Sequence, residues 1–192
     1  MPRLSLPLVA LLFLPPGLPA AQTIDYARSQ VSVLSRQMNV PVEAPFKKFN
    51  AQVSFDPNKP EAGSARVEID LNSFDIGDQD INDNIKDPNW FDTKQHPTAR
   101  FVSSSVRVLG GGKFEARGPL TIKGKTFDVV APFTMKTNGA DRIFEGAFPI
   151  RRLQYNVGDR HWRDTTVVAD EVQIKFRLYQ VAGKPAPAKK SP

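Results

Sequence analysis

The sequence contains no cysteine, only two histidines and no glycine-rich phosphate loop. Without cysteine it can form no disulfide, carries no thiol nucleophile and cannot follow the lipoprotein route, which needs a cysteine at the processed N-terminus. The glycines at 110–112 lack the Lys-Ser/Thr sequel of a phosphate loop. No Gly-x-Ser-x-Gly elbow accompanies His96 or His161, so we do not expect a serine-type hydrolase.

An apolar run of membrane-spanning length is also missing. The longest run, residues 4–14, is much shorter than the roughly 20 residues that a spanning helix needs. Arg3 precedes this run and small residues follow it at 17–21, a pattern that predicts a secretory signal peptide over residues 1–21. We therefore expect a periplasmic or secreted protein; an uncleaved anchor is the disfavoured alternative.

Most of the net positive charge comes from the two ends of the chain. Of the formal net charge of +6, Arg3 lies in the predicted signal peptide and three lysines lie within residues 183–192. The remaining excess is too small for the basic surface that nucleic acid binding requires. Residues 183–192 are rich in proline, alanine and lysine, and we predict a disordered tail there.

Short runs with alternating apolar and polar residues recur between the predicted signal peptide and the tail. Turn residues such as Asn138-Gly139 separate them, which favours antiparallel neighbours. Prolines 41 and 45 are expected to break the chain between the run that ends at residue 39 and the one that begins at residue 46. The pattern predicts seven or eight strands in a sandwich or a closed barrel. The runs cover residues 30–39, 46–55, 64–71, 99–108, 114–123, 127–135, 144–150 and 171–178, and residues 23–25 form a brief entry run before them.

One insertion interrupts the strand pattern. Residues 78–86 have no period of two and predict a short helix, and Asp87-Pro88 predicts a second helix start. Trp90 and Phe91 follow, so that an aromatic pair can act as a lid over an apolar surface. The run 78–82 imitates a calcium loop but lacks its turn glycine and bidentate glutamate, and helix capping is the better interpretation.

The polar segment 151–166 is the strongest candidate for chemistry. His161 with Asp159 and Asp164 offers at most a weak metal site, because structural zinc normally uses four defined ligands. The arginines of this segment suit either anion binding or ion pairs at a solvated hairpin end. We expect no metal ion, and the sequence leaves the role of the arginines open.

The aromatic content is dominated by phenylalanine, with 13 Phe against 3 Tyr and 2 Trp. Phenylalanine brings no polar atom that must be satisfied, so these rings suit a filled core or the wall of a cavity equally well. An eight-stranded barrel is wide enough to enclose one small ligand. Periodicity alone does not separate a hollow barrel from a filled one.

Two motifs are specific enough to indicate a family. They are Leu-Thr-Ile-Lys-Gly at 120–124 and Trp-x-Asp-Thr-x-Val-Val-x-Asp-Glu-Val at 162–172. With them the chain resembles the YceI-like family of secreted, lipocalin-like β-barrels that bind polyisoprenoid or related lipids. Residues 33–40 and 47–49 depart from the family, whose second and third strands commonly carry a histidine and glycines. The matching segments are residues 55–57, 67–75, 81–92, 96–104, 118–126, 152–158 and 162–172.

The resemblance implies an all-β, antiparallel, eight-stranded lipocalin-like barrel over residues 22–182, with a short helical insertion. It implies a carrier for an isoprenoid-tailed lipid (polyprenol, polyprenyl phosphate or isoprenoid quinone), without catalytic residues or a cofactor. Transient membrane contact and a homodimer are left open. The ligand-binding residues that we expect are Trp90, Phe91, Phe101, Phe114, Phe133, Phe148, Ile150, Arg152 and Tyr155, the last two as contacts for a polar head.

Two alternatives belong to other classes of protein. The first is a secreted stress or interaction protein that has a filled barrel and binds no lipid. The second is a small-substrate hydrolase that uses His161 and the nearby carboxylates.

Overall fold

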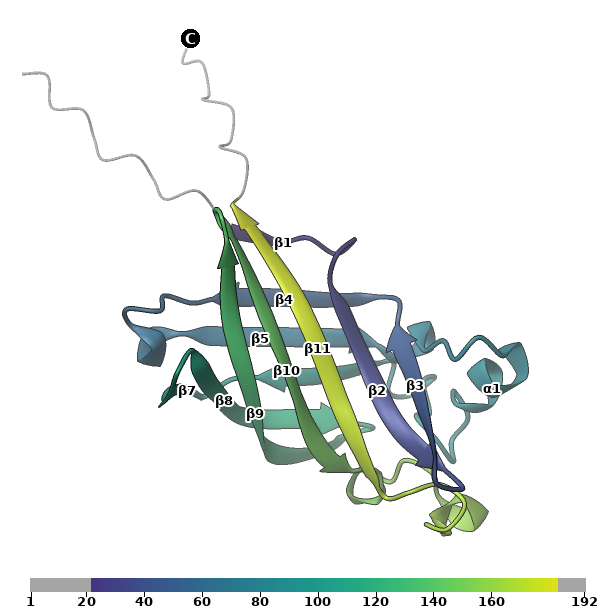
Figure 1. Ribbon diagram of the computed structural model, residues 1–192. Coiled ribbons are helices and arrows are strands. Elements are labelled where there is room, and N and C mark those ends of the chain that lie inside the picture. Colours follow the sequence, from purple (N-terminus) through teal and green to yellow (C-terminus); the bar gives the residue numbers. More distant parts are fainter. Residues whose placement is uncertain (1–21, 183–192) are drawn as a thin grey trace, which may run out of the picture.

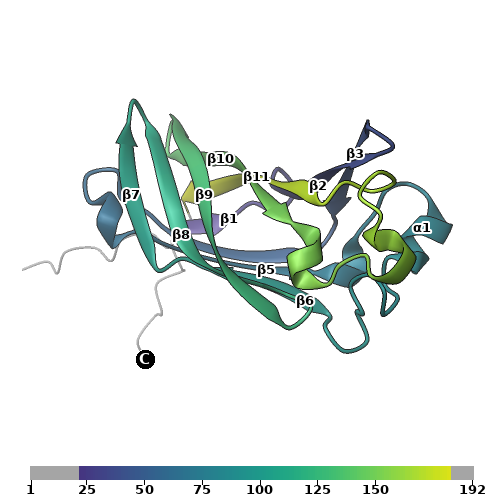
Figure 2. The same ribbon diagram turned by 90° about the horizontal axis from the view of Figure 1, so that it is seen from below.

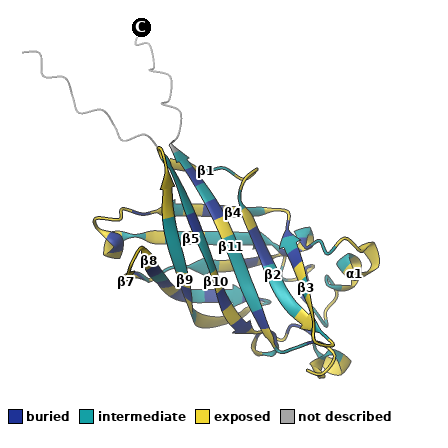
Figure 3. Ribbon diagram, viewed as in Figure 1, coloured by how far each residue is buried: buried dark blue, intermediate teal, exposed yellow. Residues whose placement is uncertain are grey.

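Apolar residues at every second position turn one side of each strand toward a common interior. The computed structural model describes residues 22–182, which form one curled antiparallel sheet (Figure 1). Buried positions alternate with less buried ones along all of β8 (Lys113–Ile122) and along the second half of β10 (Asp141–Arg151) (Figure 3). The predicted signal peptide and tail lie outside the described residues and stay predictions.

The sheet follows a path of nine strands, and two further strands pair beside that path. β1 (Gln22–Ile24) pairs with β11, and β7 (Ser105–Gly110) pairs with β8. All pairings are antiparallel, as the sequence predicts. The path runs β3 (Val40–Phe46), β2 (Gln30–Gln37), β11 (Glu171–Ala182), β10 (Asp141–Arg151), β9 (Lys125–Asn138), β8 (Lys113–Ile122), β6 (Thr98–Val102), β5 (Ser64–Asp70) and β4 (Phe49–Ser54).

The sheet is strongly curled, but its two edge strands, β3 and β4, do not pair with each other. It therefore forms a half-barrel and not a closed barrel (Figure 2). Side chains from other segments bond to the backbone of the edge strand β4, and we call this open edge the seam. The Tyr26 hydroxyl accepts from the backbone N–H of Ala51 at 3.2 Å, and Gln180 Nε2 donates to the carbonyl of Val53 at 2.6 Å. The all-β, antiparallel, barrel-like fold predicted from the sequence is confirmed. Side-chain hydrogen bonds, instead of a further strand, satisfy part of the β4 edge.

The strand β3 corrects one expectation. Pro41 and Pro45 do not break the chain but lie inside this edge strand. The Pro45 carbonyl accepts from the N–H of Asp75, so it points away from β2. By alternation Pro41 has the same orientation, and neither missing N–H costs the β2–β3 pairing a hydrogen bond. Proline ends a strand only where its nitrogen faces a partner.

The run predicted at 99–108 is two strands, β6 and β7. The chain turns at Ser103 and Ser104, whose N–H groups donate to the carbonyls of Ala65 and Arg117. The carbonyl of Val102 approaches β8 so closely there that a Cβ at Gly118 would lie 2.1 Å from it. Only glycine fits this approach, which the alternating pattern of β8 did not reveal.

The helical insertion is shorter than expected. α1 (Gln79–Asn84) begins as predicted, with the Asp78 carboxylate accepting from the N–H groups of Asp80 and Ile81. The second helix predicted at Asp87-Pro88 is wrong. Turns occupy that region instead: the N–H of Phe91 donates to the carbonyl of Ile85, and the Phe91 ring packs against Phe46 and Phe74.

Four short 3-10 turns complete the chain. η3 and η4 occupy the polar segment after β10, so that segment forms part of one end of the half-barrel. The turns are η1 (Pro60–Ala62), η2 (Leu71–Ser73), η3 (Arg152–Tyr155) and η4 (Arg160–Arg163).

Candidate functional site

The interior of the half-barrel contains two neighbouring cavities. The inner chamber has a volume of about 100 Å³, and the outer chamber, toward α1, has about 260 Å³. Three side chains, Ile69, Leu120 and Ile174, line both chambers. We call these three residues the waist, since they stand where the two spaces adjoin.

The inner chamber is apolar. Its phenylalanines come from opposite walls, and a second layer of rings packs behind them, with Phe114 stacked on Phe133 at 5.4 Å between centroids. Apart from Ser64 and Arg100 its lining side chains are apolar, so ordered water would find few hydrogen-bond partners there. Besides the waist, the lining includes Val31, Val53, Phe55, Val67, Phe101, Val106, Ala116, Ala131, Phe133, Phe144, Phe148, Phe176 and Leu178.

The outer chamber is mostly apolar and has a few polar groups. Its polar side chains include Ser35, Gln37, Asn84, Arg152 and Tyr155. Apolar lining residues that are also exposed mark its mouth: Met38, Ile81 and Val167. A few polar groups near an apolar pocket are the usual arrangement of a small-molecule site.

Arg152 is buried at the outer chamber and bonds only to backbone carbonyls. Its Nε donates to Ala169, its Nη1 to Val157 and Gly158, and its Nη2 to Trp162 and Val168, at 2.6–3.1 Å. Burial lowers its pKa from the usual arginine value. These five contacts use the donors of the guanidinium group, so Arg152 holds the loop together instead of presenting free donors.

The loop is built closely around this guanidinium group. Gly158 has a φ of +79°, and a Cβ there would lie 2.0 Å from Arg152 Nη1. The Gly158 N–H donates to the carbonyl of Asn89, which ties the loop to the turn carrying Trp90. The Trp90 ring lies 5.8 Å from the guanidinium carbon of Arg152 and 5.2 Å from the Trp162 ring. The two tryptophans thus cover Arg152.

Tyr155 fills the place where two strands separate. The β9–β10 pairing ends at Gly146 and Phe133, and the Tyr155 ring packs beyond it, 5.2 Å from the Phe127 ring. Burial raises the pKa of the Tyr155 phenol to about 12. The phenol is therefore neutral at physiological pH and keeps its O–H as a potential donor in the wall of the outer chamber.

The His161 segment shows no catalytic arrangement. His161 is exposed and lies against Trp162, at 5.0 Å between ring centroids. The neighbouring carboxylates serve their own loop: the N–H of Arg160 lowers the pKa of Asp159, and the Thr166 hydroxyl lowers that of Asp164. Within residues 22–182, no group of three or more His, Asp or Glu side chains is arranged to hold a metal ion.

Most of the residues expected to contact a ligand line one of the chambers. Phe101, Phe133 and Phe148 line the inner chamber, while Trp90, Phe91, Ile150, Arg152 and Tyr155 line the outer one. Phe114 differs, because it packs behind the inner wall. Contact between these residues and a ligand stays a prediction.

The sequence reasoning missed the waist. Ile69, Leu120 and Ile174 occupy inward positions of β5, β8 and β11, and the alternating pattern assigns them to the inner face. It does not give their depth, which depends on where three strands distant in sequence cross the interior. The exposed mouth residues were missed because the turns and the short helix that carry them are too short to show a periodic apolar pattern.

In the described part of the chain, no helix is long and apolar enough to cross a membrane.

A family model described as the YceI-like domain matches residues 22–179. The crystal structure of Burkholderia cenocepacia BcnA is 52% identical and covers 81% of this chain and 98% of its own, with a TM-score of 0.80. A polyisoprenoid binding domain from Saccharophagus degradans shares the fold, at 17% identity and a TM-score of 0.66 over 85% of this chain and 99% of its own.

Curated relatives match a shorter part of the sequence. A UPF0312 protein of Ectopseudomonas mendocina is 32% identical over 118 residues, which cover 58% of this chain and 62% of the relative. A UPF0312 protein of Vibrio cholerae is 32% identical over 89 residues, or 46% of this chain and 47% of the relative. The chain thus spans about half the length of the curated relatives it matches.

Proposed function

The chain belongs to the YceI-like family, and from that premise we propose that it binds an isoprenoid-tailed lipid. The tail would extend from the outer chamber past the waist into the inner chamber, and the polar end would stay near the mouth. The observation that carries this proposal is the adjacency of two apolar cavities that share Ile69, Leu120 and Ile174.

The interior favours a branched, flexible hydrocarbon. Burial of apolar surface contributes roughly 25 cal/mol per Å², and the lining supplies that surface on all sides of the tail. Filling an apolar cavity also restores dispersion contacts that the empty lining lacks. The Saccharophagus degradans domain is described as polyisoprenoid-binding, which agrees with the same class of ligand.

We propose a head group that needs few charged donors. A phosphate is best held by free guanidinium or ammonium donors, but the donors of Arg152 bond to carbonyls. Lys123 Nζ likewise donates to the carbonyls of Pro88 and Asn156, and burial lowers its pKa. The Tyr155 hydroxyl and the amides of Gln37 and Asn84 suit a prenol hydroxyl or a quinone carbonyl.

A carrier role in the periplasm or outside the cell fits the signal peptide expected at residues 1–21. No reaction is part of the proposal: Asp159 and Asp164 bond within their own loop and do not orient His161 as a base would require. Lipid binding is a passive exchange between the chambers and another apolar environment.

Native mass spectrometry of gently purified protein tests this function. We expect an apolar adduct, or uptake of an added polyprenol or isoprenoid quinone, with polyprenyl phosphate taken up more weakly. A protein that stays at its apo mass with all three ligands would instead be the secreted interaction protein with a filled barrel. The hydrolase alternative requires an activity that His161→Ala abolishes while lipid uptake persists.

A further inference from the structure

The mouth of the outer chamber is surrounded by exposed apolar side chains. Met38 is 74% exposed, Val40 61%, Ile81 38% and Val167 39%. They come from the β2–β3 hairpin, α1 and the loop after η4, so three distant segments contribute. We call these four residues the docking rim. Met38, Ile81 and Val167 also line the outer chamber, which makes the exposed surface continuous with the cavity.

The rim is a defined surface and not a set of loose ends. The N–H of Met38 donates to the carbonyl of Val167 at 2.9 Å, and Gln37 forms a β-bridge with Val168. Ile81 reaches the same opening from the capped helix α1. The hairpin and the η4 loop are thus hydrogen-bonded neighbours, and the mouth lies between them and the helix.

Met38 occupies a backbone conformation that does not favour methionine. Its φ is +46° and that of Asn39 is +65°, so both central residues of the hairpin turn are left-handed. Such turns prefer asparagine, aspartate or glycine. Neither the turn nor the core requires an exposed apolar side chain here, which points to a contact outside the folded chain.

We propose that the docking rim contacts the surface of a lipid bilayer, so that the cargo passes between the membrane and the outer chamber without crossing water. This rests on the proposed function, because a lipid in the chamber must come from a membrane or return to one. Exposing an isoprenoid tail to water would cost roughly 25 cal/mol per Å² of its surface, and a rim seated in the interface avoids that exposure.

The segments that carry the rim have no excess of positive charge. Their acidic residues outnumber the basic ones, so the contact is apolar and needs no anionic lipid. The basic residues on these segments are Arg36, Lys86, Arg160 and Arg163, and the acidic ones are Glu43, Asp78, Asp80, Asp83, Asp87, Asp159, Asp164 and Asp170.

A second copy of the chain fits this surface less well. The neighbouring sheet edge is that of β3, where Pro41 and Pro45 provide no N–H for pairing and the N–H of Asp75 already bonds to the Pro45 carbonyl. The rim itself consists of a turn, one face of a short helix and a loop. A bilayer needs no matching hydrogen bonds, and the flexible Met38 side chain adapts to it.

Binding of the purified protein to phosphatidylcholine vesicles, measured by co-sedimentation without added isoprenoid, tests the proposal. We expect the wild type to bind at both low and high salt. The double variant Met38→Asn with Val40→Thr should bind the vesicles at least about tenfold more weakly. Its fold should be unchanged, because asparagine suits the positive φ of position 38 and threonine suits a strand at position 40. The matched control is Val108→Thr with Leu109→Asn at the β7–β8 hairpin, where the side chains are 58% and 54% exposed.

The proposal is overturned if the wild type does not bind the vesicles, if the rim variant binds like wild type, or if the hairpin control loses as much. A wild-type dimer in analytical ultracentrifugation that the rim variant abolishes would assign the rim to a second copy instead. Uptake of a polyprenol from detergent micelles involves no bilayer, so it reports separately on the lipid-binding function. The control should retain that uptake.

Discussion

Arg152 shows that a charged residue can serve as a structural centre. It is only 3% exposed, and its guanidinium group joins five carbonyls from residues 157–169. Hydrogen bonds to charged groups are stronger than neutral ones, and carbonyls left buried without donors cost about 1–3 kcal/mol each. The sequence suggested anion binding or solvated ion pairs for this residue. In the structure its N–H groups donate to backbone carbonyls instead.

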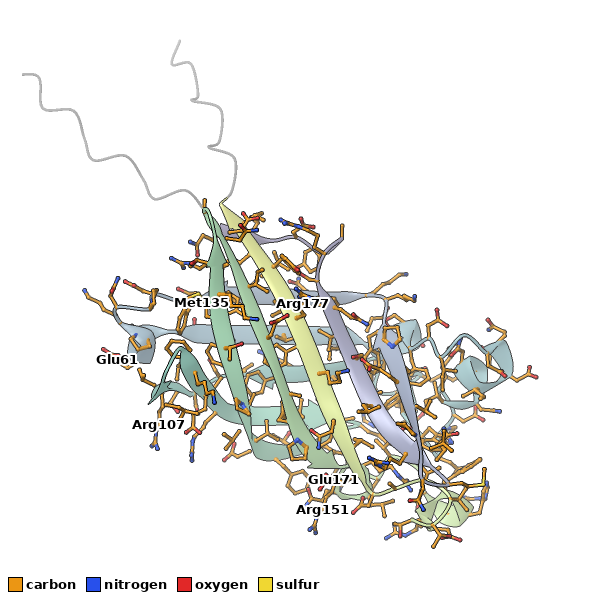
Figure 4. All side chains as sticks on the ribbon, viewed as in Figure 1. Glu61, Arg107, Met135, Arg151, Glu171 and Arg177 are labelled. Atoms are coloured by element: carbon orange, nitrogen blue, oxygen red, sulfur yellow. The ribbon has the colours of Figure 1, made fainter. Side chains whose placement is uncertain are left out.

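Replacing this guanidinium group should therefore cost stability. We expect Arg152→Met to lower the free energy of unfolding by about 3 kcal/mol or more, because several buried carbonyls lose their donors. Urea denaturation measures the change. The control is Arg151→Met, one residue earlier, whose exposed side chain is labelled near Glu171 in Figure 4. Equal stability of the two variants would contradict the structural role of Arg152.

Tyr155 provides a prediction about alkaline pH. Its phenol has a pKa raised to about 12 by burial. A raised folded-state pKa stabilises the fold below the unfolded value of about 10, and this contribution disappears as the pH rises through the folded value. In an ultraviolet titration of tyrosinate we expect a late step near pH 12 that Tyr155→Phe removes. If the late step remains in that variant, the burial of Tyr155 described above is wrong.

At the scale of elements, β4 is an edge strand protected by side chains instead of a partner strand. Tyr26 accepts from the Ala51 N–H and donates to Asn50, and Gln180 donates to the Val53 carbonyl. Gln180 Oε1 is buried and has no partner among the described residues. Side-chain caps of this kind let a sheet stop short of full closure without leaving a bare edge.

Removing one cap should loosen the seam locally. We expect Tyr26→Phe to speed hydrogen exchange of the Ala51 amide and to lower the free energy of unfolding by about 1 kcal/mol, as for one net hydrogen bond. Exchange of the Ala131 amide, in β9 away from the seam, serves as the internal control. Unchanged exchange at Ala51 would mean that the Tyr26 hydroxyl does not protect this edge.

The walls of the inner chamber should set the length of tail that fits. Ala131, which is 4% exposed, lies on β9 and lines that chamber. We expect Ala131→Leu to weaken binding of a long isoprenoid about tenfold and to leave a short one, which ends at the waist, nearly unaffected. Titration with a prenol length series measures this difference.

The matched control for the chamber variant is Ala147→Leu on β10, where the side chain is exposed on the outer face. It adds the same atoms outside the cavity. If both variants bind all lengths alike, the tail does not enter the inner chamber.

The sequence predicted the elements well where the local pattern decides them. The alternation of β8 and β11, the Asn138-Gly139 turn and the Asp78 cap are all local signals. The strand β3 was missed because prolines are tolerated only on an edge, and the edge is defined by strands far away in sequence. The depth of Ile174 and the burial of Arg152 likewise depend on how distant strands cross.

At the scale of the whole molecule, the outer surface and the interior have different roles. The outer face of the sheet carries ion pairs between strands, such as Arg177–Glu145 at 2.8 Å and Lys175–Glu43 at 2.6 Å (Arg177 is labelled in Figure 4). Exposed pairs of this kind contribute little stability, typically 0–1 kcal/mol. These charged side chains make the outer face of the sheet polar. Burial of the apolar interior stabilises the fold, and the same interior contains the two chambers.

In the proposed complex, the tail of an isoprenoid lipid occupies the inner chamber while its polar end lies at the mouth. A photoreactive isoprenoid with a diazirine at the far end of its tail tests this directly, by mass spectrometric mapping of the crosslinked residue. We predict crosslinks to the inner wall, at Ala116, Phe133 or Leu178. Crosslinks confined to the outer face of the sheet, or to the docking rim alone, would contradict the account.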